Sequence, residues 1–174
     1  MKKESIILIG MAGVGKSTIG SSLAEALGFD FIDVDDYISE KEGKTLQEII
    51  DAEGEETFLD IEKRRIYEID LVRKVVAPGG SIIYQSGLME YLKQQSTLVY
   101  LDDSFENIEG KIYNASARGI VGLKNKSLRQ IYDERKPLYA KYADITLHCK
   151  GKSQSQIVKE ILRRHVALCG SEAD

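Results

Sequence analysis

The sequence predicts an α/β fold in which helices flank a parallel sheet. Short apolar runs alternate with longer segments of helical period, and a glycine-rich loop joins the first run to the first helical segment. This alternation is typical of βαβ units, whose strands lie parallel in one sheet. No repeat or low-complexity tract divides the 174 residues, so we expect a single domain over residues 1–174 with one buried core.

The strands are predicted from short, mostly aliphatic runs. Ser5–Ile9 is such a run closed by glycine, as expected of a strand that is buried on both faces. Four further runs fit strands of the same sheet: Phe29–Val34, which ends in acids, Val75–Ala77, Leu98–Leu101 and Ile145–His148.

Three helices are predicted from apolar residues that are spaced so as to lie on one face of a helix. The first begins at about Lys16 and stops at Gly28, a residue type favoured after a helix. A long helix is expected over Glu55–Arg73 and a closing helix over Ser153–His165. The apolar stripes are Ile19, Leu23, Ala26 and Leu27 in the first helix, and Phe58, Ile61, Ile69 and Val72 in the second. Residues 114–127 carry little periodicity and predict a mobile loop, and the tail 169–174 is expected to be flexible.

Composition excludes several classes of function. The formal net charge is -4, whereas a nucleic-acid binder normally carries a basic excess, so no nucleic-acid partner is expected. The apolar run Ile6–Ile9 is too short to cross a membrane. Cys149 and Cys169 lack the spacing of metal ligands and are read as reduced thiols. These features favour a cytoplasmic protein without a membrane partner, and we expect a monomer that binds a small-molecule substrate.

The segment Gly10-Met11-Ala12-Gly13-Val14-Gly15-Lys16-Ser17 satisfies the phosphate-binding pattern G-x-x-x-x-G-K-[ST]. Glycines let the backbone turn so that several N–H groups face phosphate oxygens, and the following helix N-terminus adds partial positive charge. Lys16 is placed to reach the β- and γ-phosphates, and the Ser17 hydroxyl to bind Mg²⁺. We therefore expect ATP, with GTP as the less favoured nucleotide, together with Mg²⁺.

Later motifs narrow the interpretation. Taken in order and spacing, they resemble those of the shikimate kinase family of small-metabolite kinases, over a region from about Ile6 to Ile161. The motifs are Asp33-Val34-Asp35, Gly54-Glu55-x-x-Phe58, Gly79-Gly80, Arg118 in the glycine-rich loop, and Arg135-Lys136-Pro137-Leu138-Tyr139. The resemblance implies a P-loop three-layer α/β/α sandwich with a five-stranded parallel sheet and a mobile lid that closes on ATP. It also implies transfer of the ATP γ-phosphate to a hydroxyl group.

On the nucleotide side, the resemblance implies that Asp33 acts on Mg²⁺ through coordinated water, beside Ser17. Arg118 matches the arginine of the lid, and Lys111 stands where the family has an arginine that stacks on adenine. An arginine suits such a lid because its planar fork pairs with phosphate bidentately. The expected nucleotide contacts are Gly10, Ala12, Gly13, Val14, Gly15, Lys16, Ser17, Thr18, Lys111 and Arg118.

On the substrate side, the resemblance implies that Asp35 hydrogen-bonds the accepting hydroxyl, which a carboxylate can orient and deprotonate. Gly79 and Gly80 would lie against the substrate, and Arg135 would contact its carboxylate. The expected catalytic residues are Lys16, Asp35 and Arg118.

The chain departs from the family pattern mainly at the acceptor side. Leu59 stands where the family has an arginine that forms a charged fork on the shikimate carboxylate, and Lys63 lies one helical turn further on. Loss of such a contact removes roughly 1.5–3 kcal/mol of binding free energy. Ser81 replaces a third glycine, and the run Gly119-Ile120-Val121 replaces the proline and leucines that follow the lid arginine. Leu59 and Ser81 are therefore expected to face the acceptor.

Simpler roles exist for several of these residues. Asp33 and Asp35 could be polar residues that leave a strand, Arg118 a solvated loop residue, and Arg135 an anchor for its helix.

Four functions stay open at this point. The first is a shikimate kinase that tolerates Leu59, and the second a related kinase for a sugar acid, a polyol or a hydroxy-amino acid. The third is a catalytically silent ATP-binding regulator, which the intact phosphate loop disfavours. A nucleoside monophosphate kinase would need several arginines around a second phosphate, and the central chain offers few beyond Arg64, Arg65 and Arg73.

Overall fold

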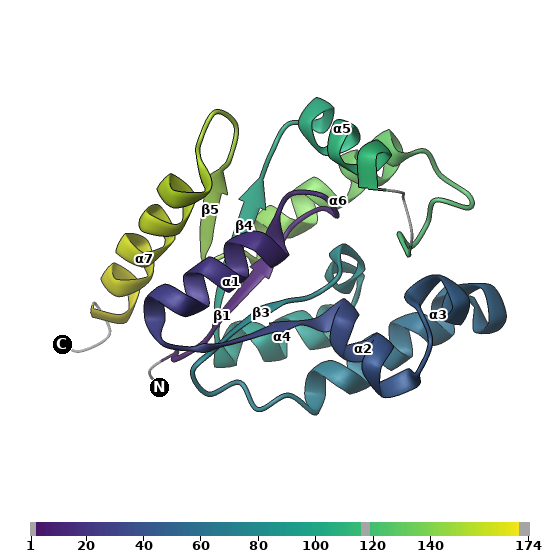
Figure 1. Cartoon of the computed structure of the whole chain (residues 1–174), viewed down its shortest axis with the longest axis horizontal. Coiled ribbons are helices and arrows are strands. Elements are labelled where there is room, and N and C mark those ends of the chain that lie inside the picture. Colours follow the sequence, from purple (N-terminus) through teal and green to yellow (C-terminus); the bar gives the residue numbers. More distant parts are fainter. Residues whose placement is uncertain (1–2, 116–118, 171–174) are drawn as a thin grey trace.

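The computed structural model describes residues 3–115 and 119–170 and confirms the predicted fold class. Five parallel strands form one sheet in the order β2-β3-β1-β4-β5, with helices on both faces (Figure 1). The strands are β1 (Ile6–Ile9), β2 (Asp30–Asp33), β3 (Lys74–Ala77), β4 (Thr97–Asp102) and β5 (Ile145–His148). The helices are α1 (Lys16–Leu27), α2 (Val34–Glu42), α3 (Leu46–Tyr67), α4 (Ser86–Gln95), α5 (Phe105–Ala115), α6 (Leu128–Tyr142) and α7 (Gln154–Gly170), with a short 3₁₀ helix, η1 (Gly80–Tyr84).

Alternate residues of β1 enter two apolar cores, one on each face of the sheet. Ile6 and Leu8 pack with α1 and α7, whereas Ile7 and Ile9 pack with α3, α4 and α6. Because β1 is wholly buried between these layers, its carboxyl end is held firmly at the centre of the sheet. The loop that follows β1 therefore starts from a rigid position.

Helix α3 differs from the predicted segment 55–73 at both ends. It begins at Leu46, where Thr45 and Glu48 form a capping box, and Gly54 kinks it with φ 88° and ψ 166°. It ends at Tyr67, so the prediction that Val72 belongs to its apolar stripe is wrong: Val72 is 58% exposed in the connection to β3. Phe58 and Ile61 do face the core as predicted.

The predicted loop and tail are only partly described. Helix α5 extends through Ala115, and residues 119–127 form turns before α6. Gly119 and Gly122 donate backbone hydrogen bonds to Gln47 and Glu55 of α3, at 3.0 and 2.7 Å. Cys169 and Gly170 belong to α7, and the rest of the predicted flexible tail lies outside the described residues.

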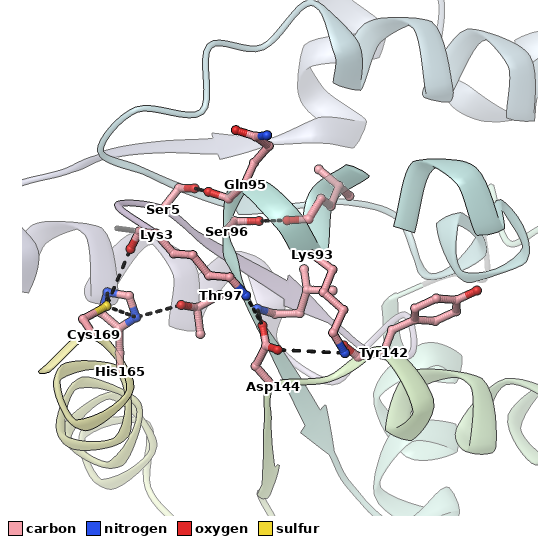
Figure 2. A network of polar contacts seen from close by, with 12 residues as sticks. Lys3, Ser5, Lys93, Gln95, Ser96, Thr97, Tyr142, Asp144, His165 and Cys169 are labelled. Atoms are coloured by element: carbon pink, nitrogen blue, oxygen red, sulfur yellow. Dashed lines mark hydrogen bonds and ion pairs between the residues drawn. The ribbon is translucent and has the colours of Figure 1, made fainter. Parts of the chain in front are cut away.

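Polar contacts join the amino ends of the central strands to the last helix and the chain start (Figure 2). Asp144 accepts hydrogen bonds from the Leu98 N–H at 3.0 Å and from Lys3 Nζ at 3.3 Å. His165 of α7 lies 3.1 Å from Thr97 Oγ1, and Cys169 Sγ donates to the Lys3 carbonyl at 3.7 Å. This network is structural, and it occupies the edge of the sheet opposite the carboxyl ends of the strands.

The two cysteines are free thiols, as predicted from their spacing. Within the described ranges, 3–115 and 119–170, no helix is both long enough and apolar enough to cross a membrane.

Candidate functional site

A cleft of about 660 Å³ runs along the carboxyl edge of the sheet. In an open α/β sheet this edge is where ligands bind, because the loops after the strands converge there. The cleft joins the loop after β1, the acids after β2, the glycines after β3 and the segments after β4 and β5. Its lining includes Ala12–Ile19, Asp33, Asp35, Ala77–Gly80, Asp103, Asn107, Lys111, Cys149, Gly151, Lys152 and Gln154.

The loop after β1 leaves backbone donors free for an anion. Helix α1 begins after Gly15, which adopts φ 103° and makes no side-chain cap, and the first turn contains no acidic residue. The first N–H groups of a helix need partners, and phosphate oxygens supply them. Gly10 approaches β4 so closely that a Cβ there would lie 2.8 Å from the Leu101 carbonyl oxygen. The loop therefore requires glycine at this position for steric reasons.

Lys16 lies over the loop that it belongs to. Its Nζ donates to the carbonyl oxygens of Gly10 and Met11, at 2.8 and 2.9 Å. Loss of hydration lowers the pKa of Lys16 to about 8, and the charge of Asp35 partly opposes that effect. Lys16 thus remains mostly protonated at neutral pH and supplies a positive charge inside the cleft.

Ser17 and Asp33 meet across the start of α1 and the end of β2. The Ser17 hydroxyl donates a hydrogen bond to Asp33 Oδ2. The other oxygen, Oδ1, accepts from the backbone N–H groups of Asp35 and Asp36, at 3.0 and 3.3 Å, and so caps α2. The cap fixes the Asp33 carboxylate, which leaves Oδ2 directed at the phosphate loop.

Asp35 lines the cleft, and one oxygen of its carboxylate is unpaired. Its Oδ1 is buried and has no hydrogen-bond partner among the described residues. Burial raises the pKa of Asp35 to about 6, and the neighbouring charge of Asp33 raises it further, while Lys16 acts in the opposite direction. A ligand hydroxyl is the kind of donor that would supply the missing hydrogen bond to this carboxylate.

The turn that begins η1 brings backbone close to three buried polar side chains. A Cβ on Gly79 would lie 2.8 Å from Glu62 Oε1 and 3.3 Å from Asp35 Oδ1. A Cβ on Gly80 would lie 3.0 Å from Arg135 Nη1. Both glycines are therefore needed for close approach, and both line the cleft as predicted for a substrate surface.

The remaining predicted substrate residues, Arg135, Ser81 and Leu59, do not line the cleft. Arg135 is 1% exposed, donates through Nη2 to the Val121 carbonyl at 2.8 Å, and stacks over the Tyr84 ring at 5.2 Å. Ser81 is buried and donates to Glu62 Oε2 at 3.3 Å. Leu59 is half-buried against the core that contains α3, and the cleft lining within the described residues includes none of the three.

The predicted adenine residue and the predicted lid residue have different outcomes. Lys111 lines the cleft, and its Nζ lies 3.5 Å from Asp103 Oδ2 in an ion pair. Its contact with adenine stays a prediction. Arg118 lies outside the described residues, as do residues 116 and 117 of the predicted lid.

Sequence reasoning missed Glu62, which is fully buried. Burial raises the pKa of Glu62 to about 8. The charge of Asp35 raises this pKa as well, whereas the hydrogen bond from Ser81 lowers it. The available signal was its spacing, because Glu62 lies midway between Phe58 and Ile66, four residues from each, on the core face of the helix.

Comparisons with known proteins find relatives that match nearly the whole chain. A protein-family model described as shikimate kinase matches residues 12–165 of the chain. The shikimate kinase of Persephonella marina is 38% identical over 92% of this chain and 98% of its own length. That of a Sulfurihydrogenibium species is 34% identical over 92% and 97%. The solved structure of Acinetobacter baumannii shikimate kinase in complex with shikimate superposes with a TM-score of 0.87 and 32% identity, covering 94% of this chain and 93% of that one.

Proposed function

We propose, because the chain belongs to the shikimate kinase family, that it transfers the γ-phosphoryl group of ATP to a hydroxyl group of shikimate. The observation that carries the proposal is one cleft that the phosphate loop and Asp35 both line, where the Asp35 carboxylate keeps an oxygen without a partner among the described residues. Phosphoryl transfer depends mainly on positioning and charge neutralisation, and this cleft offers both.

On the nucleotide side, the backbone of Gly10–Ser17 binds the phosphates, and the Lys16 ammonium neutralises charge on the transferring group. For this, Lys16 exchanges its two carbonyl partners for phosphate oxygens, which accept more strongly because they are charged. Arg118 completes the charge neutralisation as part of a lid, and closing the lid excludes water that would compete as acceptor.

The residues present fit a bound Mg²⁺. Ser17 and Asp33 supply hard oxygen donors at the start of the phosphate loop helix. Across residues 3–115 and 119–170, no group of three or more acidic, histidine or cysteine side chains forms a metal cage. A small protein ligand set suits Mg²⁺, which keeps several waters and takes phosphate oxygens as its other ligands. When bound, the ion would supply positive charge beside the phosphates, and Ser17 and Asp33 would hold it.

On the acceptor side, the Asp35 carboxylate accepts a hydrogen bond from the substrate hydroxyl and aligns that hydroxyl for in-line attack. A carboxylate with a raised pKa is suited to take that proton as the bond to phosphorus forms. Gly79 and Gly80 form the surface against which the substrate lies, since no side chain stands between backbone and cleft there.

A second acceptor class is favoured by one observation. Leu59 lies against the apolar core, and two of the Arg135 donor groups are already committed, Nη2 to the Val121 carbonyl and Nε to the Tyr84 hydroxyl at 3.3 Å. Carboxylate binding therefore depends on fewer free cationic donors than the family pattern implies. A sugar acid, a polyol or a hydroxy-amino acid is the alternative substrate.

The test is release of ADP from Mg·ATP with shikimate, and then with a panel of hydroxylated acids, polyols and amino acids. Turnover on shikimate supports the proposal, and Lys16→Ala in the same assay excludes a contaminating kinase. Turnover on another acceptor alone would replace the substrate but keep the reaction. ATP binding without turnover on any acceptor would favour the regulator.

We further propose that the enzyme acts as a monomer in the cytoplasm. The free thiols of Cys149 and Cys169 fit a reducing compartment. The molecular mass of the active enzyme, measured by sedimentation, tests whether it is a monomer.

A further inference from the structure

We propose that Glu62 is a positioning residue for the acceptor side of the site, held as an uncharged carboxylic acid behind the Gly79–Ser81 turn. We further infer that Leu59 is the residue that keeps it uncharged. The inference rests on the proposed function, because it gives Glu62 a part in the binding of shikimate.

The geometry places Glu62 against the wall of the cleft. Its side chain comes from α3 and is fully buried, and Oε2 accepts a hydrogen bond from Ser81 Oγ at 3.3 Å. Oε1 has no hydrogen-bond partner in the described part of the chain and lies 2.8 Å from where a Gly79 Cβ would stand. Gly79 and Gly80 line the cleft, and Glu62 supports the turn from behind.

The surroundings disfavour a charged carboxylate at this position. A buried carboxylate needs a cation in contact or several donors, and without them it takes up a proton. Glu62 accepts a hydrogen bond from the Ser81 hydroxyl, the Gly79 backbone N–H acts on it in the same direction, and it has no ion-pair partner among the residues that the structure describes. Burial raises its pKa to about 8, well above that of an exposed glutamate.

The charged and titratable groups around Glu62 come from several elements. Asp35 raises the pKa of Glu62, and Arg135 lowers it, but two of the Arg135 donor groups are committed to Val121 and Tyr84. Among the described residues, the groups that interact with Glu62 include Asp35 of α2, Lys16 of α1, and Arg135 and Tyr139 of α6.

Leu59 matters because it precedes Glu62 by three residues on α3. Residues at this spacing are neighbours on a helix, so an arginine at position 59 would stand beside the Glu62 carboxylate and favour its charged form. Leucine provides no charge and packs on the core instead. Lys63 is exposed, one position after the buried Glu62, and so it lies on another side of the helix.

The proton on Glu62 affects binding of an acidic acceptor. The Gly79 turn already has the carboxylate of Asp35 beside it. Ionisation of Glu62 would add a second negative charge behind the surface that the shikimate carboxylate approaches. Affinity for shikimate therefore falls as the pH rises through the pKa of Glu62, whereas a neutral side chain at position 62 removes that dependence.

Calorimetric titration of shikimate from about pH 6 to about pH 9 tests this, with the dissociation constant rising up to about tenfold per pH unit above the pKa in the wild type. Glu62→Ala removes the acceptor of Ser81 and is expected to weaken binding about tenfold at the acidic end. Glu62→Gln is expected to recover most of that loss and to show a flatter profile than the wild type. Asp60→Asn removes an exposed charge from the same helix and should follow the wild type.

Two results would overturn the inference. One is binding by Glu62→Gln as weak as that of Glu62→Ala near pH 6, which would mean that an ionised Glu62 is required. The other is an equal alkaline loss in the wild type and in Glu62→Gln.

A measurement on the free protein separates this inference from the proposed substrate. The ¹³C carboxyl resonance of Glu62, assigned by its disappearance in Glu62→Gln, should titrate with a midpoint near 8. A midpoint at the ordinary glutamate value of about 4.3 rejects the uncharged acid whatever the substrate is. If the midpoint is near 8 but shikimate fails to bind at every pH, the proton assignment stands, while the positioning role and the proposed substrate both fail.

Discussion

Ser17 donates its hydroxyl hydrogen bond to Asp33, and this contact joins the phosphate loop to the end of β2. The same carboxylate caps α2 through its other oxygen. One acid thus links three parts of the site: the first turn of α1, the end of a strand and the helix that carries Asp35. The arrangement makes the proposed Mg²⁺ position sensitive to either partner.

Ser17→Ala is expected to raise the Mg²⁺ concentration needed for half-maximal activity and to lower turnover by about tenfold to a hundredfold, because a direct oxygen ligand is lost. Titration of activity with Mg²⁺ at saturating ATP measures both effects. Ser21→Ala removes an exposed hydroxyl from the same helix and serves as the control. An unchanged Mg²⁺ requirement in Ser17→Ala would remove Ser17 from the metal site.

Lys16→Ala is expected to lower turnover by about a hundredfold or more, because it deletes a positive charge that acts on the transferring phosphoryl group. Steady-state release of ADP with shikimate measures this. Lys159→Ala, an exposed lysine on α7, controls for a general loss of charge. Full turnover in Lys16→Ala would contradict the proposed mechanism.

Gly79→Ala tests the close approach at the turn before η1. Its φ of −60° suits alanine, so the effect is steric: the new Cβ would lie 2.8 Å from Glu62 Oε1. We expect a loss of about 1–3 kcal/mol in the free energy of unfolding, as for other overpacked sites, and a raised KM for shikimate. Urea unfolding and steady-state kinetics measure the two effects.

Gly87→Ala is the matched control for this substitution, since nothing lies within 4 Å of the added Cβ in α4. Alanine is favoured over glycine inside a helix, so Gly87→Ala is expected to be neutral or slightly stabilising. Equal behaviour of the two variants would show that the Gly79 turn tolerates a side chain.

The strands and the phosphate loop were predictable because their signals are local. β5 has the predicted bounds, and the buried run before the glycine-rich loop forms β1. The ends of α3 were not predictable from its apolar stripe alone. Its start depends on the capping box of Thr45 and Glu48, and the kink at Gly54 changes the direction of the helix between two apolar stretches.

The buried side of the candidate site depended on tertiary packing. The spacing of Glu62 from Phe58 was visible in the sequence. Acidic residues are usually exposed, however, so its burial became evident only from the packing of the helices on the sheet. The same holds for Arg135, whose burial against Tyr84 and Val121 follows from how α6 packs on η1. Its predicted contact with substrate stays a prediction.

Leu59→Arg is expected to increase affinity for shikimate by about tenfold to a hundredfold, the value of a charge-assisted bidentate contact. The guanidinium would also stand beside Glu62 and lower the pKa of that carboxyl, and its positive charge would offset the negative charge of the ionised Glu62. Calorimetric titration measures the affinity. Leu59→Lys adds the charge without the fork and should increase affinity less. No gain in either variant would mean that the acceptor surface is shaped for another substrate.

The stability of the protein should depend on pH through Glu62. The folded-state pKa of about 8 exceeds that of the unfolded chain, so the native state binds the additional proton. The contribution to stability is complete below the unfolded pKa of about 4.3 and is lost as the pH rises through the folded value. At pH 7 the wild type has therefore lost roughly 3–4 kcal/mol relative to acid conditions.

Glu62→Gln removes this proton linkage. As the pH rises, the free energy of unfolding of the variant should therefore increase relative to that of the wild type. The expected relative gain is on the order of 1–3 kcal/mol between about pH 5 and about pH 8. Urea unfolding of both proteins and of Asp60→Asn at several pH values measures it, with Asp60→Asn expected to run parallel to the wild type. Parallel curves for the wild type and Glu62→Gln would show that Glu62 is ionised throughout this range, because only a group whose proton affinity changes on folding can alter the slope.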